Sequence, residues 1–128
     1  MAEQFPGLAR VLVVEDNAMI ATVLTDMFEM IGVQTVKTAT SIGEASQLLE
    51  SCDFDLAVVD IKLGEENGLM VANQCSERKM PVIISTGYSD LALPVAYSSE
   101  QLLAKPYSMK DLYKTLAKVF RSKPMAIP

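Results

Sequence analysis

The stretch Leu56-Ala57-Val58-Val59-Asp60 is a run of four aliphatic residues that ends in an acid. Continuous apolar runs of this length are typical of strands that are buried on both faces, as in a parallel sheet covered by helices. The same character recurs in three other runs, Val11–Val14, Val82–Ile84 and Leu102–Ala104. A fifth candidate, Val33–Lys37, mixes polar residues into the run. We therefore expect this strand to lie at one end of the sheet.

Helical patterns separate these runs. After the first run, apolar residues recur at steps of three and four and stop before a glycine, which predicts an amphipathic helix. These residues are Ile20, Val23, Leu24, Met27, Phe28 and Ile31. Capping boxes at Ser41 and Ser108 predict two more helices. The segments Leu69–Glu77 and Ser89–Tyr97 give weaker signals, and because Pro94 interrupts the second, we expect this fourth helix to be short or irregular. Alternating strands and helices predict an α/β fold, a doubly wound five-stranded parallel sheet.

Length and composition limit the possible functions. A chain of 128 residues fits one domain, which we expect to span residues 9–121 with tails at 1–8 and 122–128. The net charge of −5, with scattered basic residues, argues against direct nucleic-acid binding. No apolar run approaches the ~18 residues of a membrane span, so we expect a cytoplasmic protein. The chain has no histidine, which disfavours zinc sites and Ser/His/Asp catalysis.

Polar residues stand at the expected carboxyl ends of four strands, where doubly wound sheets place their ligand sites. These residues are Glu15, Asp16, Asp60, Thr86 and Lys105. Three carboxylates at one edge would repel each other unless a cation or Lys105 compensated them. Mg²⁺ takes oxygen ligands and keeps several waters, so Asp16, Asp60 and a phosphoryl oxygen would suit it. A carboxylate can also act as the nucleophile of phosphoryl transfer, with Lys105 and Mg²⁺ holding charge and Thr86 offering its hydroxyl.

From about Ala9 to Arg121 the chain resembles the receiver domain of bacterial response regulators. The motifs that carry the resemblance are the acidic pair within Val13–Asn17, the run Leu56–Asp60, the glycine eight residues later at Gly68, and Lys105-Pro106-Tyr107. The resemblance implies a flavodoxin-like (βα)5 sheet of strand order 2-1-3-4-5.

The resemblance also implies a function, that of a phosphoacceptor receiver in two-component phosphorelay signalling. Asp60 would accept phosphate from a histidine kinase or a histidine phosphotransfer protein. Asp16, Asp60 and the Lys62 backbone carbonyl would hold Mg²⁺, while Glu15 would act largely through bound water. Such a domain is not a conventional enzyme, because it phosphorylates and dephosphorylates itself. Its output would be contact with a downstream protein or onward phosphate transfer, and the sequence leaves both open.

The sequence departs from the family pattern at three places. Leu102 stands where the family commonly has an aromatic switch residue, three positions before Lys105. Gly64 replaces a frequent proline, so we expect the loop after Asp60 to be more mobile. The segment Pro81–Tyr88 resembles the Thr-Gly-Tyr variant of the single-domain receivers common in alphaproteobacteria, whose fourth helix is atypical.

Three other functions fit parts of the pattern. A degenerate receiver could serve as a phosphorylation-independent binding module, although all five site residue types are retained. An aspartyl-nucleophile phosphatase of the haloacid dehalogenase type would need an acid two residues after Asp60, where this chain has Lys62. A flavodoxin-like cofactor binder would need a phosphate loop after the first strand, where Glu15 and Asp16 would repel phosphate.

Overall fold

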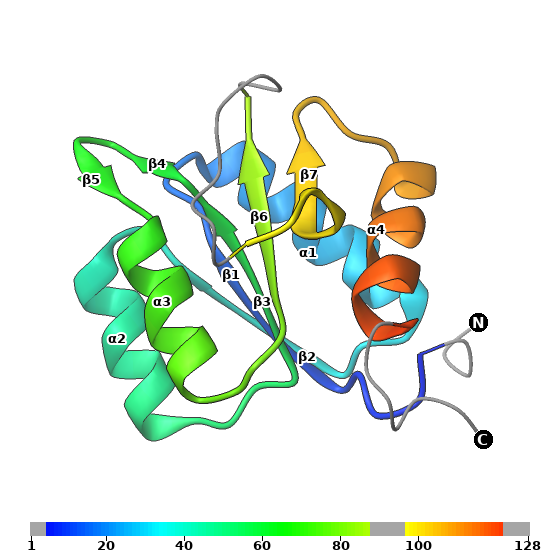
Figure 1. Ribbon diagram of the computed structural model, residues 1–128, viewed down its shortest axis with the longest axis horizontal. Coiled ribbons are helices and arrows are strands. Elements are labelled where there is room, and N and C mark those ends of the chain that lie inside the picture. Colours follow the sequence, from blue (N-terminus) through cyan, green and yellow to red (C-terminus); the bar gives the residue numbers. More distant parts are fainter. Residues whose placement is uncertain (1–4, 88–96, 122–128) are drawn as a thin grey trace.

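The computed structural model describes residues 5–87 and 97–121 (Figure 1). Its main sheet contains β1 (Arg10–Val14), β2 (Thr35–Ala39), β3 (Leu56–Asp60), β6 (Val82–Thr86) and β7 (Leu102–Ala104). All neighbouring strands in it are parallel, and their order is β2-β1-β3-β6-β7. Counted along the chain within this sheet, the order is 2-1-3-4-5, so the predicted topology is confirmed.

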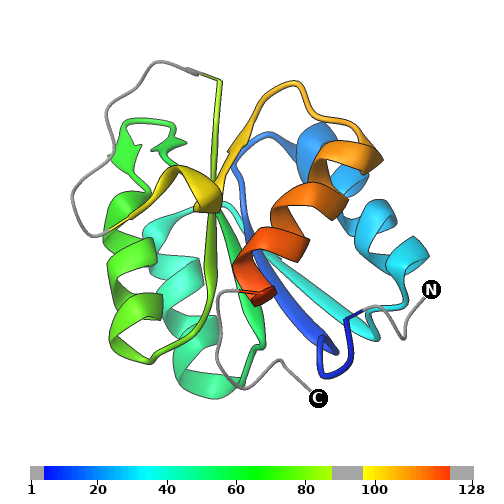
Figure 2. The ribbon, with the colours of Figure 1, turned by 45° about the vertical axis from the view of Figure 1, so that its right-hand side comes forward.

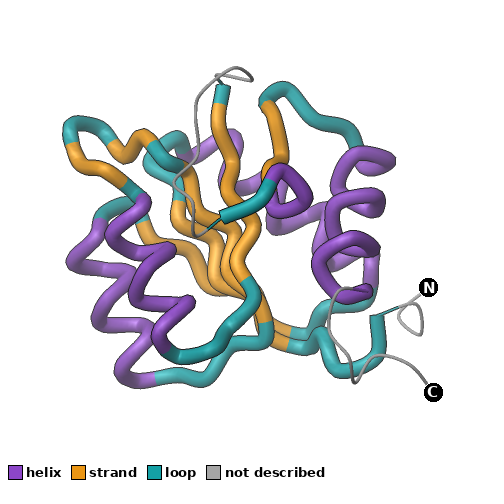
Figure 3. Tube along the Cα trace, in the orientation of Figure 1, coloured by secondary structure: helices purple, strands orange, loops and turns teal. Residues whose placement is uncertain are grey.

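Helices cover both faces of this sheet. The helices α1 (Ala18–Ile31) and α4 (Met109–Arg121) lie on one face, and α2 (Ile42–Ser51) and α3 (Leu69–Glu77) lie on the other (Figures 1 and 3). The turned view in Figure 2 separates the two helix pairs. Strand residues alternate between the two resulting cores, as Val58 packs on the α1/α4 side and Val59 on the α2/α3 side. The apolar runs are therefore buried on both faces, as predicted.

The two predicted capping boxes differ in how completely they form. At α4, the Asp111 amide donates to Ser108 Oγ at 3.2 Å and the Ser108 amide donates to Asp111 Oδ2 at 2.8 Å, so both halves are present. At α2, Ser41 Oγ accepts from the Glu44 amide, but the Glu44 carboxylate accepts from the Thr40 amide. The capping box at α2 is therefore only half formed, because the Glu44 carboxylate binds the amide of Thr40 and not that of Ser41.

The edge strand begins two residues later than predicted. Strand β2 covers Thr35–Ala39, and its pairing with β1 begins between Arg10 and Thr35. The preceding residues still belong to the end of α1, because Gly32 caps the helix with φ of 110° and the Val33 amide donates to the Phe28 carbonyl at 3.0 Å. Val33 is buried in the α1/α4 core and is not part of the ladder. Val33 therefore belongs to the C-terminal end of α1 and not to strand β2, although it is β-branched.

Three short elements were not predicted from the sequence. An antiparallel pair, β4 (Lys62–Leu63) and β5 (Glu66–Asn67), follows β3, and a 3₁₀ turn, η2 (Ser99–Gln101), precedes β7. Elements of two or three residues are too short to show a periodic pattern. The predicted helix at Ser89–Tyr97, apart from Tyr97, lies outside the described residues. None of the helices within the described ranges has the length and apolar character to cross a membrane.

Candidate functional site

A cavity of about 920 Å³ opens at the carboxyl ends of β1, β3 and β6. The structure brings all the site residues predicted from the sequence to its wall: Glu15, Asp16, Asp60, Lys62, Thr86 and Lys105. Parallel pairing explains this convergence, because the register aligns Asp60 with Ser85 and Thr86 with Ala104 at the same edge of the sheet. The sheet edge that was predicted to carry the site therefore borders an open cavity.

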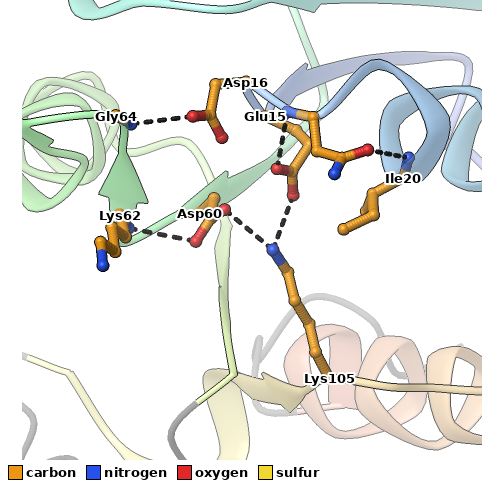
Figure 4. Close-up of polar contacts among 8 residues, drawn as sticks. Glu15, Asp16, Ile20, Asp60, Lys62, Gly64 and Lys105 are labelled. Atoms are coloured by element: carbon orange, nitrogen blue, oxygen red, sulfur yellow. Dashed lines mark hydrogen bonds and ion pairs between the residues drawn. The ribbon is translucent and has the colours of Figure 1, made fainter.

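Lys105 links two buried carboxylates in the floor of this cavity. Its Nζ lies 2.8 Å from Asp60 Oδ2 and 3.0 Å from Glu15 Oε1 (Figure 4). Glu15 is 2% exposed and Asp60 is 5% exposed. Burial raises the pKa of Glu15, although the hydrogen bond from Lys105 opposes this rise. Burial alone would lower the pKa of Lys105. Its hydrogen bonds to Asp60 and Glu15 outweigh this effect, so the pKa of Lys105 is raised above its ordinary value. The lysine therefore stays charged at neutral pH.

Backbone amides of the β4–β5 segment hold carboxylates from the opposite side. The Lys62 amide donates to Asp60 Oδ1 at 3.1 Å, and the Gly64 amide donates to Asp16 Oδ2 at 2.9 Å (Figure 4). Both oxygens of Asp60 are thus engaged, one by this amide and one by Lys105. The loop after Asp60, which the sequence predicted to be more mobile, forms a hairpin with defined hydrogen bonds, and its mobility stays a prediction.

Three carboxylates in this cavity are close enough to hold one metal ion. One oxygen each from Glu15, Asp16 and Asp60 lies within 4.8 Å of the others. Asp16 is exposed at the mouth, whereas the other two lie in the buried floor. Among the described residues, only the Lys105 ammonium forms an ion pair with them. One cation against three carboxylates leaves an excess of negative charge that a divalent cation would offset.

Thr86 ends strand β6 at the wall of the cavity and is 2% exposed. Its carbonyl accepts a hydrogen bond of 2.7 Å from the Lys105 amide, which ties β6 to the segment that carries the lysine. Leu102, which stands where the family commonly has an aromatic residue, is half-buried against the α2/α3 core. Thr86 and Lys105 are thus placed together, while Leu102 is directed away from the α1/α4 side.

Gly68 supports the site in a way that sequence reasoning did not recognise. A Cβ at this position would overlap the Asp60 carbonyl oxygen and would lie 2.9 Å from the Asp60 carbonyl carbon. The Gly68 amide also donates to the Ile61 carbonyl at 2.6 Å. The chain therefore returns across the residue that carries the central carboxylate, and only glycine fits there. Its spacing of eight residues from Asp60 was the available signal.

Comparison with known proteins gives a consistent result. Residues 11–117 match the response regulator receiver domain family. Transcriptional regulatory protein PdtaR of Mycobacterium tuberculosis is 32% identical over 107 residues, which are 80% of this chain and 52% of that protein. The chain thus spans about half the length of this curated relative.

Two solved structures are also similar. The solution structure of SdrG from Sphingomonas melonis Fr1 is 30% identical with a TM-score of 0.79, covering 90% of this chain and 98% of that one. Response regulator protein TrrA from Thermotoga maritima, crystallised in complex with Mg²⁺ and BeF, is 26% identical with a TM-score of 0.74, covering 87% and 98% of the two chains. The fold, the acidic cavity and the family match agree, and this chain belongs to the response regulator receiver domain family.

Proposed function

We propose that this receiver domain is phosphorylated on Asp60 in a Mg²⁺-dependent reaction. The observation that carries the proposal is the position of the Asp60 carboxylate, which ends a central buried strand in the floor of an open cavity. The Asp60 carboxylate lines the cavity that a phosphoryl donor would enter, while the buried strand β3 fixes its backbone. The neighbouring ammonium of Lys105 adds a fixed positive charge 2.8 Å away.

The donor set fits Mg²⁺. Hard carboxylate oxygens are the ligands this ion prefers, and it keeps several waters in sites that offer few protein ligands. Asp16, Asp60 and the Lys62 backbone carbonyl would hold the ion, with Glu15 acting through bound water. When bound, Mg²⁺ would supply positive charge beside the phosphoryl oxygens. The excess of carboxylates over ammonium groups in the cavity supports this assignment.

The reaction needs positioning and charge more than further chemistry. A carboxylate oxygen of Asp60 would form a bond to phosphorus as the bond between phosphorus and the donor imidazole nitrogen breaks. The electron pair of that bond stays on the nitrogen, which then takes a proton. Lys105 would stabilise charge on the phosphoryl oxygens, and the Thr86 hydroxyl would donate a hydrogen bond to one of them.

A second groove, of about 400 Å³, adjoins the cavity. It lies between α1 and the segment after β7, and Met19, Ile20, Val23, Pro106 and Tyr107 line it. Ile20 and Lys105 border both hollows. Met19 is 76% exposed. Large apolar side chains that gather on a surface usually mark a contact site. We propose that a histidine kinase or a histidine phosphotransfer protein places a helix here, so that its phosphohistidine reaches Asp60.

The docking proposal predicts a selective defect. Met19→Glu should slow phosphate transfer from a phosphorylated histidine phosphotransfer protein by about tenfold or more, because it buries a charge in an apolar contact. Phosphorylation by acetyl phosphate should be unchanged. Met30→Glu is the matched control, since Met30 is 71% exposed on the same helix but does not line the groove. Equal effects of both substitutions on partner transfer would refute the assignment of the groove.

Intact-mass spectrometry tests the proposed phosphorylation. Native protein incubated with acetyl phosphate and Mg²⁺ should gain one phosphoryl group, and Asp60→Asn should gain none. Chelation of Mg²⁺ should suppress the gain in the native protein. A receiver that works only as a phosphorylation-independent binding module would show no gain under any of these conditions, and that result would reject the proposal.

A further inference from the structure

The hydrogen bond from the Gly64 amide to Asp16 singles out one backbone group beside the acidic cavity. Gly64 N lies 2.9 Å from Asp16 Oδ2, and among the described residues this amide is the one hydrogen-bond donor to the Asp16 carboxylate. In Figure 4 the second oxygen of Asp16 points toward the carboxylates of Glu15 and Asp60. The amide thus occupies one oxygen and leaves the other directed into the cluster of three carboxylates.

The amide is available because residue 64 is a glycine with φ of 59°. A proline at this position would have no N–H and would have φ fixed near −65°. It could neither donate this bond nor adopt this turn. Asp16 and Gly64 are 48 residues apart in the sequence, so the contact joins the loop after β1 to the turn between β4 and β5.

The turn that carries Gly64 is itself anchored on both sides. Pairing of Leu63 with Glu66 closes the hairpin. On the β4 side the Lys62 amide donates to Asp60 Oδ1 at 3.1 Å, and on the β5 side Glu66 Oε1 accepts a hydrogen bond of 3.0 Å from the Ile42 amide at the start of α2. These contacts hold the turn, and with it the Gly64 amide, in one position beside Asp16.

We propose that Gly64 is a positioning residue of the metal site, whose amide orients the Asp16 carboxylate for Mg²⁺. The proposal rests on the Mg²⁺ site proposed above. Asp16 is exposed, and without this donor its carboxylate would sample other rotamers and lose that freedom on binding the ion. Groups that orient metal ligands from outside typically change metal affinity by about 10- to 100-fold when removed. The contrary role, in which the amide competes with the ion for Asp16, would make its removal strengthen binding.

A single-atom change separates these two roles. Replacing the Gly64 amide nitrogen by an ester oxygen removes the N–H and preserves the side-chain-free turn. Cys52 and Cys75, the two cysteines of the chain, flank this position. Chemical ligation at these cysteines can therefore assemble segments 1–51, 52–74 and 75–128 without further substitution. The all-amide protein made by the same route is the reference.

Isothermal titration with MgCl₂ gives the decisive comparison. The ester at residue 64 should raise the Kd for Mg²⁺ by about tenfold relative to the all-amide protein. An ester at residue 65, whose amide has no hydrogen bond within the described part of the chain, should leave Kd within about twofold. Far-UV circular dichroism and resolved amide signals of the sheet will verify that each protein is folded. An unchanged or lower Kd for the ester at residue 64 would overturn the inference.

A recombinant variant adds an independent measurement. Gly64→Asn retains the N–H, and asparagine tolerates the left-handed region, so Mg²⁺ affinity should stay within about threefold of the native value. In native protein, exchange of the Gly64 amide proton should be slowed both without and with Mg²⁺. Loss of this protection on adding Mg²⁺ would contradict the orienting role. Native protein that binds no Mg²⁺ would instead reject the proposed function on which the inference rests.

Discussion

Substitution of Gly68 by alanine should strongly destabilise the protein. The added Cβ would overlap the Asp60 carbonyl oxygen and lie 2.9 Å from its carbon and 3.2 Å from the Ile61 carbonyl oxygen. All three atoms belong to the backbone at the end of β3, so no side-chain rotation can relieve the overlap. Overpacking typically costs 1–3 kcal/mol, and weakening of the Gly68–Ile61 hydrogen bond adds about 1 kcal/mol. We therefore expect a loss of about 3 kcal/mol in the free energy of unfolding.

Urea titration followed by far-UV circular dichroism measures this loss. With a slope of about 2 kcal/mol per molar urea, the midpoint should fall by about 1.5 M. Gly43→Ala is the control, because a Cβ there meets only Ser41 Oγ at 3.9 Å within helix α2. Alanine at a helical site should increase stability by up to about 1 kcal/mol. If Gly68→Ala and Gly43→Ala shifted the midpoint equally, or if Gly68→Ala left it unchanged, the close approach to Asp60 would be refuted.

Two further predictions concern charge in and beside the cavity. Lys105→Met should slow phosphorylation by acetyl phosphate about 100-fold, because a preorganised positive charge is lost, while calorimetry should still detect Mg²⁺ binding; an unchanged rate would contradict the role given to Lys105. Burial raises the pKa of Tyr107 to about 12, and the nearby Glu15 carboxylate adds to this rise. An acid whose folded pKa is raised stabilises the fold fully below its ordinary pKa, near 10, and this stability is lost as pH rises toward 12. Tyr107→Phe cannot ionise and should lose less stability across this range in urea titrations, and an equal loss in both proteins would exclude Tyr107 as the cause.

The parts of the fold that follow from continuous apolar runs could be predicted from the sequence. Runs such as Leu56–Asp60 become strands buried on both faces, because helices cover both sides of the sheet. Once the strands are parallel, their carboxyl ends share one edge, so Asp60 and Lys105 had to lie near each other. The spacing alone could not show that Lys105 also contacts Glu15 at 3.0 Å.

Features that depend on local backbone geometry or on three-dimensional crossings could not be predicted. Val33 is β-branched and looks like a strand residue, but its amide belongs to the helix C-terminus. The left-handed φ of Gly64, which directs its amide to Asp16, leaves no pattern in the sequence, where this glycine predicted only a more mobile loop. The need for glycine at residue 68 arises where the chain crosses the Asp60 carbonyl, a contact that no periodic pattern records.

Mapping the phosphorylated residue tests the central claim most directly. Borohydride reduces an aspartyl phosphate to homoserine, so protein treated with acetyl phosphate and Mg²⁺, then reduced and digested, carries a permanent mark at the acceptor. Peptide sequencing by mass spectrometry should find homoserine at residue 60, and the mark should be absent when the phosphodonor or Mg²⁺ is omitted. Homoserine at residue 16 in place of residue 60, or no homoserine in protein that is folded and binds Mg²⁺, would contradict the assignment of Asp60 as the phosphoacceptor.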